Sequence, residues 1–408
     1  MSKPLPYGRQ SVTEDDIEAV VRTLKGEWLT SGPAVTEFQQ VVRTRLGVKH
    51  AIAVCNGTAA LHLCCLALGI SPGDVVVSSP LTFLASGNCA AYCGGRPDFV
   101  DIRPETYCLS PNRREDYITR NGPPRGVIPV DYAGVPAELE AVHELGKKYG
   151  FAVVEDAAHA IGSQYLAGGR WYECGSCVHS DMAIFSFHPV KTVTAGEGGM
   201  VLTNDDALAA KARMFASHGM ERDVRLFQPW SIANESGELT PAAVAASGNT
   251  KAPWLYQQQV LGFNYRITDI QSALGVSQFA RLDETIALRR AIFDRYQELF
   301  AGNEALLRPP CPEGTRPAYH LYVLRFKNMM GSRRVDVCSR LREEGIFAQV
   351  HYIPVYLQPW YQQHYGYARG KCPEAEAVYE NSLSIPLFPA MTEEDIQRVV
   401  SIVSELAG

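Results

Sequence analysis

Short apolar runs alternate with helix-like segments along the first two-thirds of the chain, and this alternation restricts the possible folds more than any other feature. The apolar runs, which we predict to form strands, are residues 51–54, 74–78, 126–130, 151–154, 182–187 and 199–203. Strands that alternate with helices build a mostly parallel sheet with helices on both faces. Such sheets bind their ligands at the carboxyl ends of the strands. We therefore predict an α/β fold whose active site lies along that edge.

The length of the chain predicts two domains. Its 408 residues exceed the roughly 100–200 residues of a typical domain. We expect a large domain over residues 1–255, which includes an N-terminal segment with a capped amphipathic helix over 13–25. A small C-terminal α/β domain over 256–408 should follow it. Residues 226–255 are rich in Ala, Ser, Gly and Thr, and this composition predicts a long loop near the boundary.

The composition is that of a soluble globular enzyme. Hydrophobic residues make up 46% and charged residues 20% of the chain, yet no run of about 18 apolar residues occurs, so no membrane span is expected. The net charge is −6 and no long basic run is present, which argues against a nucleic-acid partner. The N-terminus lacks the apolar core of a signal peptide, and a cytoplasmic location is therefore expected.

The cysteines favour a reducing compartment. There are 11 of them, and several, such as Cys64 and Cys65, stand among apolar residues, as expected of buried free thiols. Cys174 and Cys177 have the spacing of zinc ligands, but no second pair with matching spacing accompanies them. We interpret this pair as structural and expect no metal.

Two polar segments follow predicted strands. The run 151–154 leads into Glu155 and Asp156, which puts a carboxylate where sheet ligands bind. Alone, such an acid is more typical of a helix N-cap. The next strand ends at Ser186, and Lys191 follows before the glycines of 196–199, which permit tight turns and a close approach to a ligand. A lone lysine is usually a solvated surface residue, but this one lies between two predicted strands.

A third segment offers a site for phosphate. Gly57 and Thr58 stand where the first predicted strand gives way to a helix. Helix N-termini carry unpaired N–H groups and the positive end of the helix dipole, so they bind phosphate well. The alternative is that Thr58 is only an N-cap, and the sequence alone does not decide between the two.

Together the three segments match the needs of pyridoxal phosphate (PLP). This cofactor requires a lysine for covalent attachment, an acid beside its pyridine nitrogen, a phosphate cup and, usually, an aromatic ring stacked on it. The residues that can fill these roles are Lys191, Asp156, Thr58, Ser186 and Phe83.

The chain also resembles a known family, the sugar aminotransferases of the DegT/DnrJ/EryC1/StrS type. The matching blocks are WLTSGP, NGTAALHL, PLTF, VDYAG, VEDAAHAIGS, FSFHPVKTVTAGEGG, SHGM, GFNYRITDIQSALG and AQVHYIPVY. They extend over nearly the whole chain, and FSFHPVK followed by EGG is the most specific of them. The resemblance implies PLP-dependent transferase fold type I, the architecture of aspartate aminotransferase.

The resemblance also implies a role for each matching residue. Lys191 would bind PLP covalently and, once released, move a proton between the substrate carbon and the cofactor. Asp156 would pair with the pyridine nitrogen, and His159 would contact the phenolic oxygen. Phe83 would stack on the ring. The phosphate would be held by Gly57, Thr58, Ala59 and Ser186.

A further implication is a homodimer with shared active sites, because Asn264 would reach the phosphate bound by the neighbouring subunit. The candidates on the substrate side are Tyr7, Trp28, Leu29, Thr30, Arg266, His351 and Tyr352. Each of these is nearly as well explained by packing.

Within the family, the pattern is most similar to transaminases of pseudaminic acid biosynthesis. This likeness implies transfer of an amino group from L-glutamate to C4 of a UDP-linked 4-keto-6-deoxy-N-acetylhexosamine. The alternatives are a GDP- or dTDP-linked keto sugar, a PLP-dependent sugar dehydratase, and a non-catalytic PLP-binding regulator. In the dehydratases a histidine replaces the lysine, so Lys191 favours transamination. A nicotinamide-dependent dehydrogenase is disfavoured, because no G-x-G-x-x-G follows the first strand.

Overall fold

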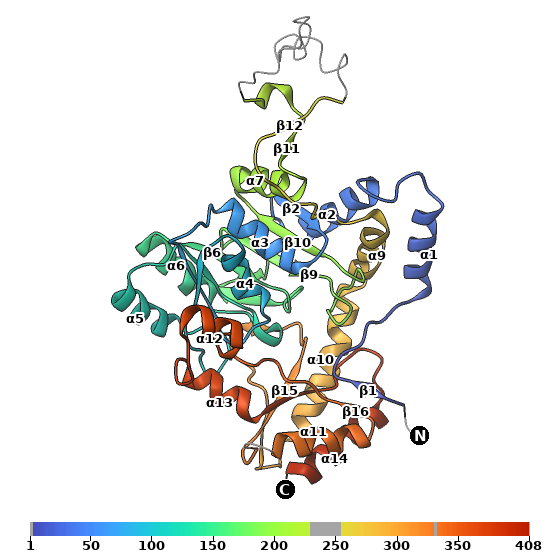
Figure 1. Ribbon diagram of the computed structural model, residues 1–408. Coiled ribbons are helices and arrows are strands. Elements are labelled where there is room, and N and C mark those ends of the chain that lie inside the picture. Colours follow the sequence, from blue (N-terminus) through green and yellow to red (C-terminus); the bar gives the residue numbers. More distant parts are fainter. Residues whose placement is uncertain (1–2, 229–253, 330–332, 408) are drawn as a thin grey trace, which may run out of the picture.

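The computed structural model describes residues 3–228, 254–329 and 333–407. At its centre is a seven-stranded sheet (Figure 1) in the order β2-β10-β9-β6-β5-β3-β4. The strands of this sheet are β2 (His50–Val54), β3 (Val75–Ser78), β4 (Arg96–Phe99), β5 (Gly126–Ile128), β6 (Ala152–Asp156), β9 (Met182–Ser186) and β10 (Gly199–Thr203). Only β10 runs antiparallel to its neighbours, β9 and β2, and the other pairs are parallel. The predicted α/β fold with a mostly parallel sheet is confirmed.

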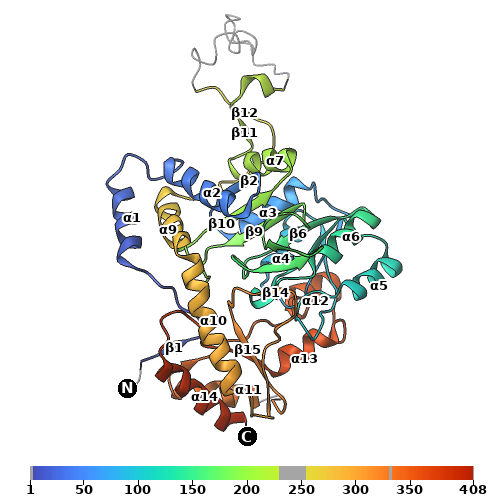
Figure 2. The same cartoon turned by 180° about the vertical axis from the view of Figure 1, so that it is seen from behind.

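Both faces of the sheet are buried, as expected of parallel strands. Val154, for example, packs in a cluster with residues of α3 (Gly57–Ala67), α4 (Ala85–Tyr92) and α7 (Asp206–Ala216). Its neighbour Val153 points the other way and packs with residues of α5 (Pro111–Asn121) and α6 (Leu139–Tyr149). Figures 1 and 2 show these helices on the two sides of the sheet.

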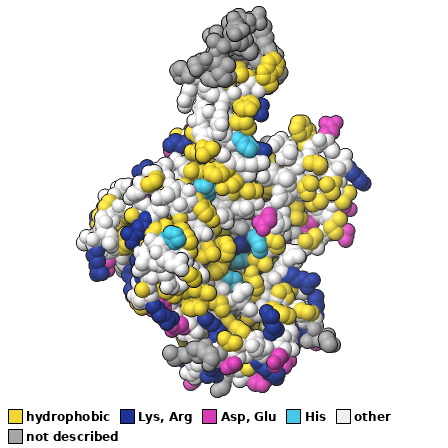
Figure 3. All heavy atoms as spheres, viewed as in Figure 1, with side chains coloured by type: hydrophobic (Ala, Val, Ile, Leu, Met, Phe, Trp, Pro, Cys, Tyr) yellow, Lys and Arg dark blue, Asp and Glu magenta, His cyan; other side chains and the backbone are white. Residues whose placement is uncertain are grey.

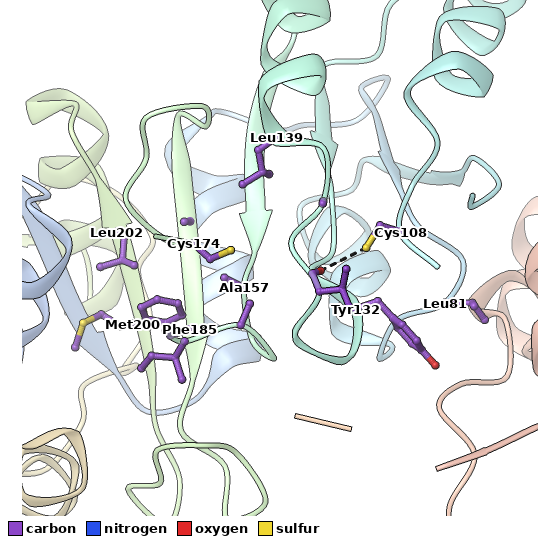
Figure 4. Packing of buried hydrophobic residues seen from close by; sticks show 14 of the residues in the cluster. Leu81, Cys108, Tyr132, Leu139, Ala157, Cys174, Phe185, Met200 and Leu202 are labelled. Atoms are coloured by element: carbon purple, nitrogen blue, oxygen red, sulfur yellow. Dashed lines mark hydrogen bonds between the residues drawn. The ribbon is translucent and has the colours of Figure 1, made fainter. Parts of the chain in front are cut away.

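A further apolar cluster lies on the α6 side and reaches the C-terminal part of the chain. It joins Phe38 of α2 (Pro33–Leu46) to Phe185 and Leu202 of the sheet. Figure 4 shows Phe185, Met200 and Leu202 packed together on adjacent strands. The helix α9 (Asp269–Ala280) packs on α2 and on α1 (Glu14–Leu24). The predicted cap of α1 is present, and Asp16 accepts a hydrogen bond of 2.9 Å from the backbone N–H of Thr13.

The C-terminal part has its own core around a small sheet of order β13-β15-β17. Its elements are α10 (Leu282–Leu299), β13 (Leu306–Leu307), β15 (Tyr322–Phe326), α11 (Arg333–Glu343), β16 (Ile346–Phe347), α12 (Pro359–Tyr365), α13 (Pro373–Asn381), β17 (Ser382–Ile385) and α14 (Glu393–Ala407). The N-terminal strand β1 (Leu5–Pro6) pairs in parallel with β16, so the start of the chain packs on this core. The division into domains at residue 255 stays a prediction.

Smaller elements complete the fold. They are β7 (Gln164–Ala167), β8 (Arg170–Glu173), β11 (Met220–Glu221), β12 (Gln257–Gln258), β14 (Thr315–Arg316), and the 3-10 turns Tyr132–Gly134, Val224–Leu226 and Val355–Leu357. Strands β11 and β12 pair with each other and flank residues 229–253, which lie outside the described residues together with most of the loop predicted over 226–255. No helix in the described part of the chain is long and apolar enough to cross a membrane. All eleven cysteines are free thiols, and Cys64, Cys65, Cys174 and Cys177 are buried.

Candidate active site

A cavity of about 640 Å³ opens at the carboxyl ends of the central strands. Side chains that are distant in the sequence meet in it, and Figure 3 shows histidine, acidic and basic groups gathered near the middle of this face. The residues that line it include Tyr7, Asn56, Gly57, Thr58, Thr82, Phe83, Ser86, Asp156, His159, Ser186, His188, Lys191, Glu197, Gln349, His351 and Tyr352. The edge of the sheet predicted to hold the active site therefore carries a cavity of ligand size, since such cavities measure about 300–1,000 Å³.

Lys191 lies in the connection between β9 and β10. Hydrogen bonds hold this connection in a compact shape, with the Phe187 amide donating to Gly198 (2.8 Å) and the Ala195 amide donating to Phe187 (2.9 Å). Gly196 has a φ of +79°, in the left-handed region that favours glycine. Burial lowers the pKa of Lys191 to about 8, although the Asp156 carboxylate acts in the opposite direction. A lysine in this state is partly neutral near pH 7, as an amine nucleophile must be.

Asp156 ends strand β6 and is buried. Its carboxylate accepts hydrogen bonds from the Ser86 hydroxyl (2.6 Å) and from the Ala158 amide (3.2 Å). Burial raises the pKa of Asp156, and the two hydrogen bonds oppose that rise. Thr82 in turn lies 2.6 Å from the Ser86 hydroxyl. Ser86 and Thr82 were not predicted from the sequence, because only the fold brings them to the end of β6.

The start of α3, where the sequence predicts a phosphate site, borders the cavity. The N-cap is Asn56, whose side chain accepts the Ala59 amide at 2.8 Å. Thr58 is therefore not the N-cap, and it lines the cavity instead. Gly57 lies so close to β9 that a Cβ there would come within 3.0 Å of the Ser186 Cβ. Ala59 is absent from the cavity lining, and its N–H is already bound to Asn56.

His159 has a defined tautomer. Its Nδ1 faces the amide of Ala133 at 3.3 Å, so Nδ1 is an acceptor and the proton sits on Nε2, which lies 3.3 Å from the Tyr352 hydroxyl. Burial lowers the pKa of His159 well below its usual value, and the charge of Lys191 acts in the same direction. The ring also packs on His320 with centroids 4.4 Å apart. This histidine is thus a neutral donor facing the cavity.

The other predicted site residues divide into two groups. Phe83, Tyr7, His351 and Tyr352 line the cavity, with the Phe83 ring 6.3 Å from that of Tyr352. The other group, which lies outside the cavity lining, consists of Trp28, Leu29, Thr30, Asn264 and Arg266. Trp28, Leu29, Thr30 and Asn264 are exposed in the single chain.

The residues around the cavity fit PLP. A partly neutral lysine, a buried carboxylate held by two hydrogen bonds, and a helix N-terminus with a close glycine are the groups that this cofactor requires. Arranged at the carboxyl edge of a mostly parallel sheet, they define a PLP-dependent enzyme of fold type I.

Comparison with known proteins defines the family. The model of the DegT/DnrJ/EryC1/StrS aminotransferase family matches residues 10–404, and the chain belongs to this family. The spore coat polysaccharide biosynthesis protein SpsC of Bacillus subtilis is 34% identical over 98% of this chain and 97% of its own. An uncharacterized protein of Methanocaldococcus jannaschii is 34% identical over 99% of this chain and 98% of its own.

Solved structures of aminotransferases are also similar to this chain. PseC of Helicobacter pylori, an aminotransferase involved in the biosynthesis of pseudoaminic acid, superposes with a TM-score of 0.85, 28% identity and 99% coverage of both chains. DesV of S. venezuelae has a TM-score of 0.80 and 30% identity, with 97% of this chain and 94% of DesV covered. The protein is a PLP-dependent aminotransferase.

Proposed function

We propose that the protein transfers an amino group from L-glutamate to C4 of a UDP-linked 4-keto-6-deoxy-N-acetylhexosamine. The observation that carries the proposal is Lys191, whose pKa burial lowers to about 8, in a cavity of about 640 Å³ that also contains Asp156. The likeness to PseC over the whole chain supports a nucleotide-linked keto sugar as the acceptor. The eleven free cysteines support a reducing compartment such as the cytoplasm.

Lys191 has two tasks in this proposal. Its neutral Nζ first holds the cofactor covalently in the cavity. When bound, PLP supplies an electron sink that allows a proton to leave the carbon bearing the amino group. Once displaced by the incoming amine, Lys191 Nζ takes this proton from the amino donor and later delivers one to C4 of the sugar. Its lowered pKa suits both steps, because a catalytic base works best near the ambient pH.

The neighbouring groups hold the cofactor. We assign to Asp156 the pairing with the pyridine nitrogen, with Ser86 and the Ala158 amide orienting the carboxylate. His159 donates its Nε2 proton to the phenolic oxygen. Gly57 and Thr58 at the start of α3, together with Ser186, would hold the phosphate of the cofactor. Phe83 would stack on the cofactor ring, and Tyr7, His351 and Tyr352 would contact the sugar.

The active unit that we propose is a homodimer. Asn264 is exposed on one chain, and we assign to it a contact with the phosphate bound by the partner subunit. Large apolar side chains outside the cavity lining are exposed as well, including Tyr92 (55%) and Leu261 (81%). Exposed apolar surface of this kind is typical of a protein–protein interface. Trp28, Leu29, Thr30 and Arg266 would then contact substrate only in the dimer.

One experiment tests the reaction. The PLP-loaded enzyme is incubated with L-glutamate and a panel of UDP-, GDP- and dTDP-linked 4-keto sugars, and the products are identified by mass. The expected product is the 4-amino sugar of the UDP-linked N-acetyl substrate, with one 2-oxoglutarate per amine. Preferential amination of a GDP- or dTDP-linked sugar would show that the proposed acceptor is wrong. Loss of a hydroxyl without gain of nitrogen would instead identify a dehydratase.

A further inference from the structure

A closed polar cluster lies behind the active site, on the opposite face of strand β6 from Asp156. Adjacent residues of a strand point to opposite faces, so Glu155 points away from the cavity. There it meets Asp131 and Cys174, and one side-chain atom from each of the three lies within 4.8 Å of the others. All three residues are buried, and Figure 4 shows Cys174 among the apolar side chains of this layer.

The hydrogen bonds of the two acids differ. The Glu155 carboxylate accepts from the Gly175 amide (2.9 Å) and from the Ser180 hydroxyl (3.3 Å). Asp131 accepts from the Ala137 amide through Oδ1 (2.8 Å), but its buried Oδ2 has no partner in the described part of the chain. A buried oxygen without a donor is costly. If Oδ2 carries a proton, it becomes a donor, and the neighbouring Glu155 carboxylate is its acceptor.

The described residues around Asp131 and Glu155 do not provide a positive charge that could balance two ionised carboxylates. The titratable groups that face Asp131 or Glu155 from other elements are Cys174, Cys177, Cys108 and Tyr165, and Asp181 acts on Cys177. Burial raises the pKa of each of these thiols and of the Tyr165 hydroxyl, so they stay neutral. No ion pair joins Asp131 or Glu155 to a basic side chain within the described ranges. Two buried carboxylates whose oxygens lie within 4.8 Å of each other repel when both are charged, and a proton held between them removes this repulsion.

We propose that Asp131 is a neutral carboxylic acid that shares its Oδ2 proton with Glu155, and that this link is a positioning device for His159. Burial raises the pKa of Asp131 well above its usual value, and repulsion from Glu155 adds to the rise. Burial also raises the pKa of Glu155, to about 7, but its carboxylate receives two hydrogen bonds from other groups that oppose the rise, so it is the better place for the charge.

The connection to the active site runs through the turn that Asp131 begins. Ala133, with a φ of +58°, donates its N–H to His159 Nδ1 (3.3 Å) and accepts the His320 amide (3.1 Å). Next to it, a Cβ on Gly134 would lie 3.1 Å from the His159 carbonyl oxygen, so the turn approaches the backbone of His159 closely. The acid pair anchors this turn to β6. This second part of the proposal rests on the proposed role of His159.

The test of the shared proton is Asp131→Asn, whose amide has the shape of the acid and donates to Glu155. Unfolding by urea is measured at fixed excess PLP from pH 5 to pH 8. A raised folded pKa means that the native wild type keeps the Asp131 proton that the unfolded chain has lost, so its stability falls as pH rises. The Asn variant lacks this proton. Glu155, whose pKa burial raises to about 7, titrates in both proteins and drops out of the ratio of their unfolding constants. The unfolding constant of wild type, divided by that of the variant, should therefore rise by about tenfold per pH unit.

The matched control is Asp16→Asn. Asp16 is also buried, but it pairs with Arg281 at 2.6 Å. Burial alone would raise the pKa of Asp16, yet hydrogen bonds from Arg281 and Ser277 lower it to about 2. Its native carboxylate is therefore ionised from pH 5 to pH 8. The control should be less stable than wild type by a factor that stays constant over this range.

If the free energies of unfolding of wild type and Asp131→Asn changed with pH in parallel, the proposal of a shared proton would be wrong. If the variant does not fold, the infrared spectrum of the wild-type holoenzyme is the deciding measurement. The C=O band of a protonated carboxyl should remain at pH 8 and above, beyond the value of about 7 to which burial raises the pKa of Glu155, and its absence there would overturn the proposal. A stoichiometric metal ion in the dialysed holoenzyme, lost in Asp131→Asn, would also overturn it, since a metal ligand is ionised. None of these measurements depends on the sugar substrate, so they stand apart from the proposed reaction.

The positioning of His159 has its own readout, the pH titration of the bound PLP chromophore. Asp131→Leu removes the anchor and should shift the titration midpoint, whereas Asp131→Asn should restore it toward the wild-type value. An unchanged midpoint in Asp131→Leu would show that the pair does not act on His159.

Discussion

At the scale of single residues, the chemistry depends on the charge of Lys191. Only a neutral amine can attack the cofactor aldehyde, and burial lowers the pKa of Lys191 to about 8. The rate at which the cofactor-free protein takes up PLP should therefore rise with pH and level off above about 8. Stopped-flow absorbance of the yellow chromophore measures this rate. A rate that does not change between pH 6.5 and pH 9 would contradict the expectation.

The same experiment identifies the lysine. After borohydride reduction, the PLP label should be found on the peptide that contains Lys191, and Lys191→Ala should carry none. Lys147→Ala is a suitable control, because Lys147 is exposed and pairs with Glu144 at 3.0 Å. A label of normal yield in Lys191→Ala would place the attachment elsewhere.

Asp156 supports a second prediction at this scale. Asp156→Asn keeps the size of the side chain and can keep the Ser86 contact, but it removes the charge that we assign to the pyridine nitrogen. PLP should still bind, while kcat should fall by about a hundredfold or more, the usual effect of losing one preorganised electrostatic partner. Steady-state kinetics and the absorbance of bound PLP separate the two effects. Turnover within a few-fold of wild type would contradict the assigned role.

At the scale of elements, helix α3 links the stability of the fold to the binding of phosphate. Asn56→Ala removes the bond from its side chain to the Ala59 amide (2.8 Å) and should cost about 1 kcal/mol of unfolding free energy. It should also weaken PLP binding severalfold, since the same turn faces the cavity. Urea unfolding and PLP titration measure the two quantities.

The control for that prediction is the cap of α7. Asp205 accepts the amides of Ala207 and Leu208 at 2.7 and 2.9 Å, and it is absent from the cavity lining. Asp205→Ala should lose a similar amount of stability without a change in PLP affinity. Equal weakening of PLP binding in both variants would mean that α3 acts only through global stability.

The elements that the sequence predicted well are those with a strong local pattern. The apolar runs of β2, β6, β9 and β10 are such cases, because each strand is buried on both faces and so reads as a continuous apolar segment. Strand β4 was not predicted, since its residues Arg96–Phe99 include a proline and two charged side chains. It lies at the edge of the sheet, where proline is tolerated.

Contacts between distant segments are what local patterns could not provide. Nothing near Asp156 in the sequence indicates the Ser86 hydroxyl, which comes from 70 residues away. The helix start shows the same limit on a smaller scale. Both Asn56 and Thr58 are suitable N-caps by residue type, and only the backbone geometry places Asn56 at the cap.

At the scale of the whole molecule, the cavity joins both ends of the chain. Tyr7 reaches it because β1 pairs with β16, and His351 follows β16 closely in sequence. Their rings lie 4.9 Å apart. The family resemblance indicated these residues, but the physical reason is a parallel strand pair between segments that are more than 300 positions apart. The resemblance also named Asn264 and Trp28, which one chain does not bring to the cavity.

A shared active site predicts complementation between two inactive variants. Lys191→Ala lacks the attachment point, and Asn264→Ala lacks the group that we expect to reach the partner's phosphate. In a hybrid dimer, one site has both Lys191 and Asn264 intact and the other has neither. Random mixing at equal amounts should therefore restore about a quarter of the wild-type sites, as follows from two-fold symmetry. Activity after refolding the mixture together measures this gain.

The control for complementation places both substitutions on one chain. When the double variant is mixed with wild type, each hybrid dimer has one site without Lys191 and one site without the partner's Asn264, so no hybrid site is complete. The activity should then come only from wild-type dimers. Native mass spectrometry should show hybrid dimers in both mixtures. Hybrids that form without any gain in the first mixture would mean that each chain builds its site alone, and the exposed apolar side chains around Leu261 would need another partner.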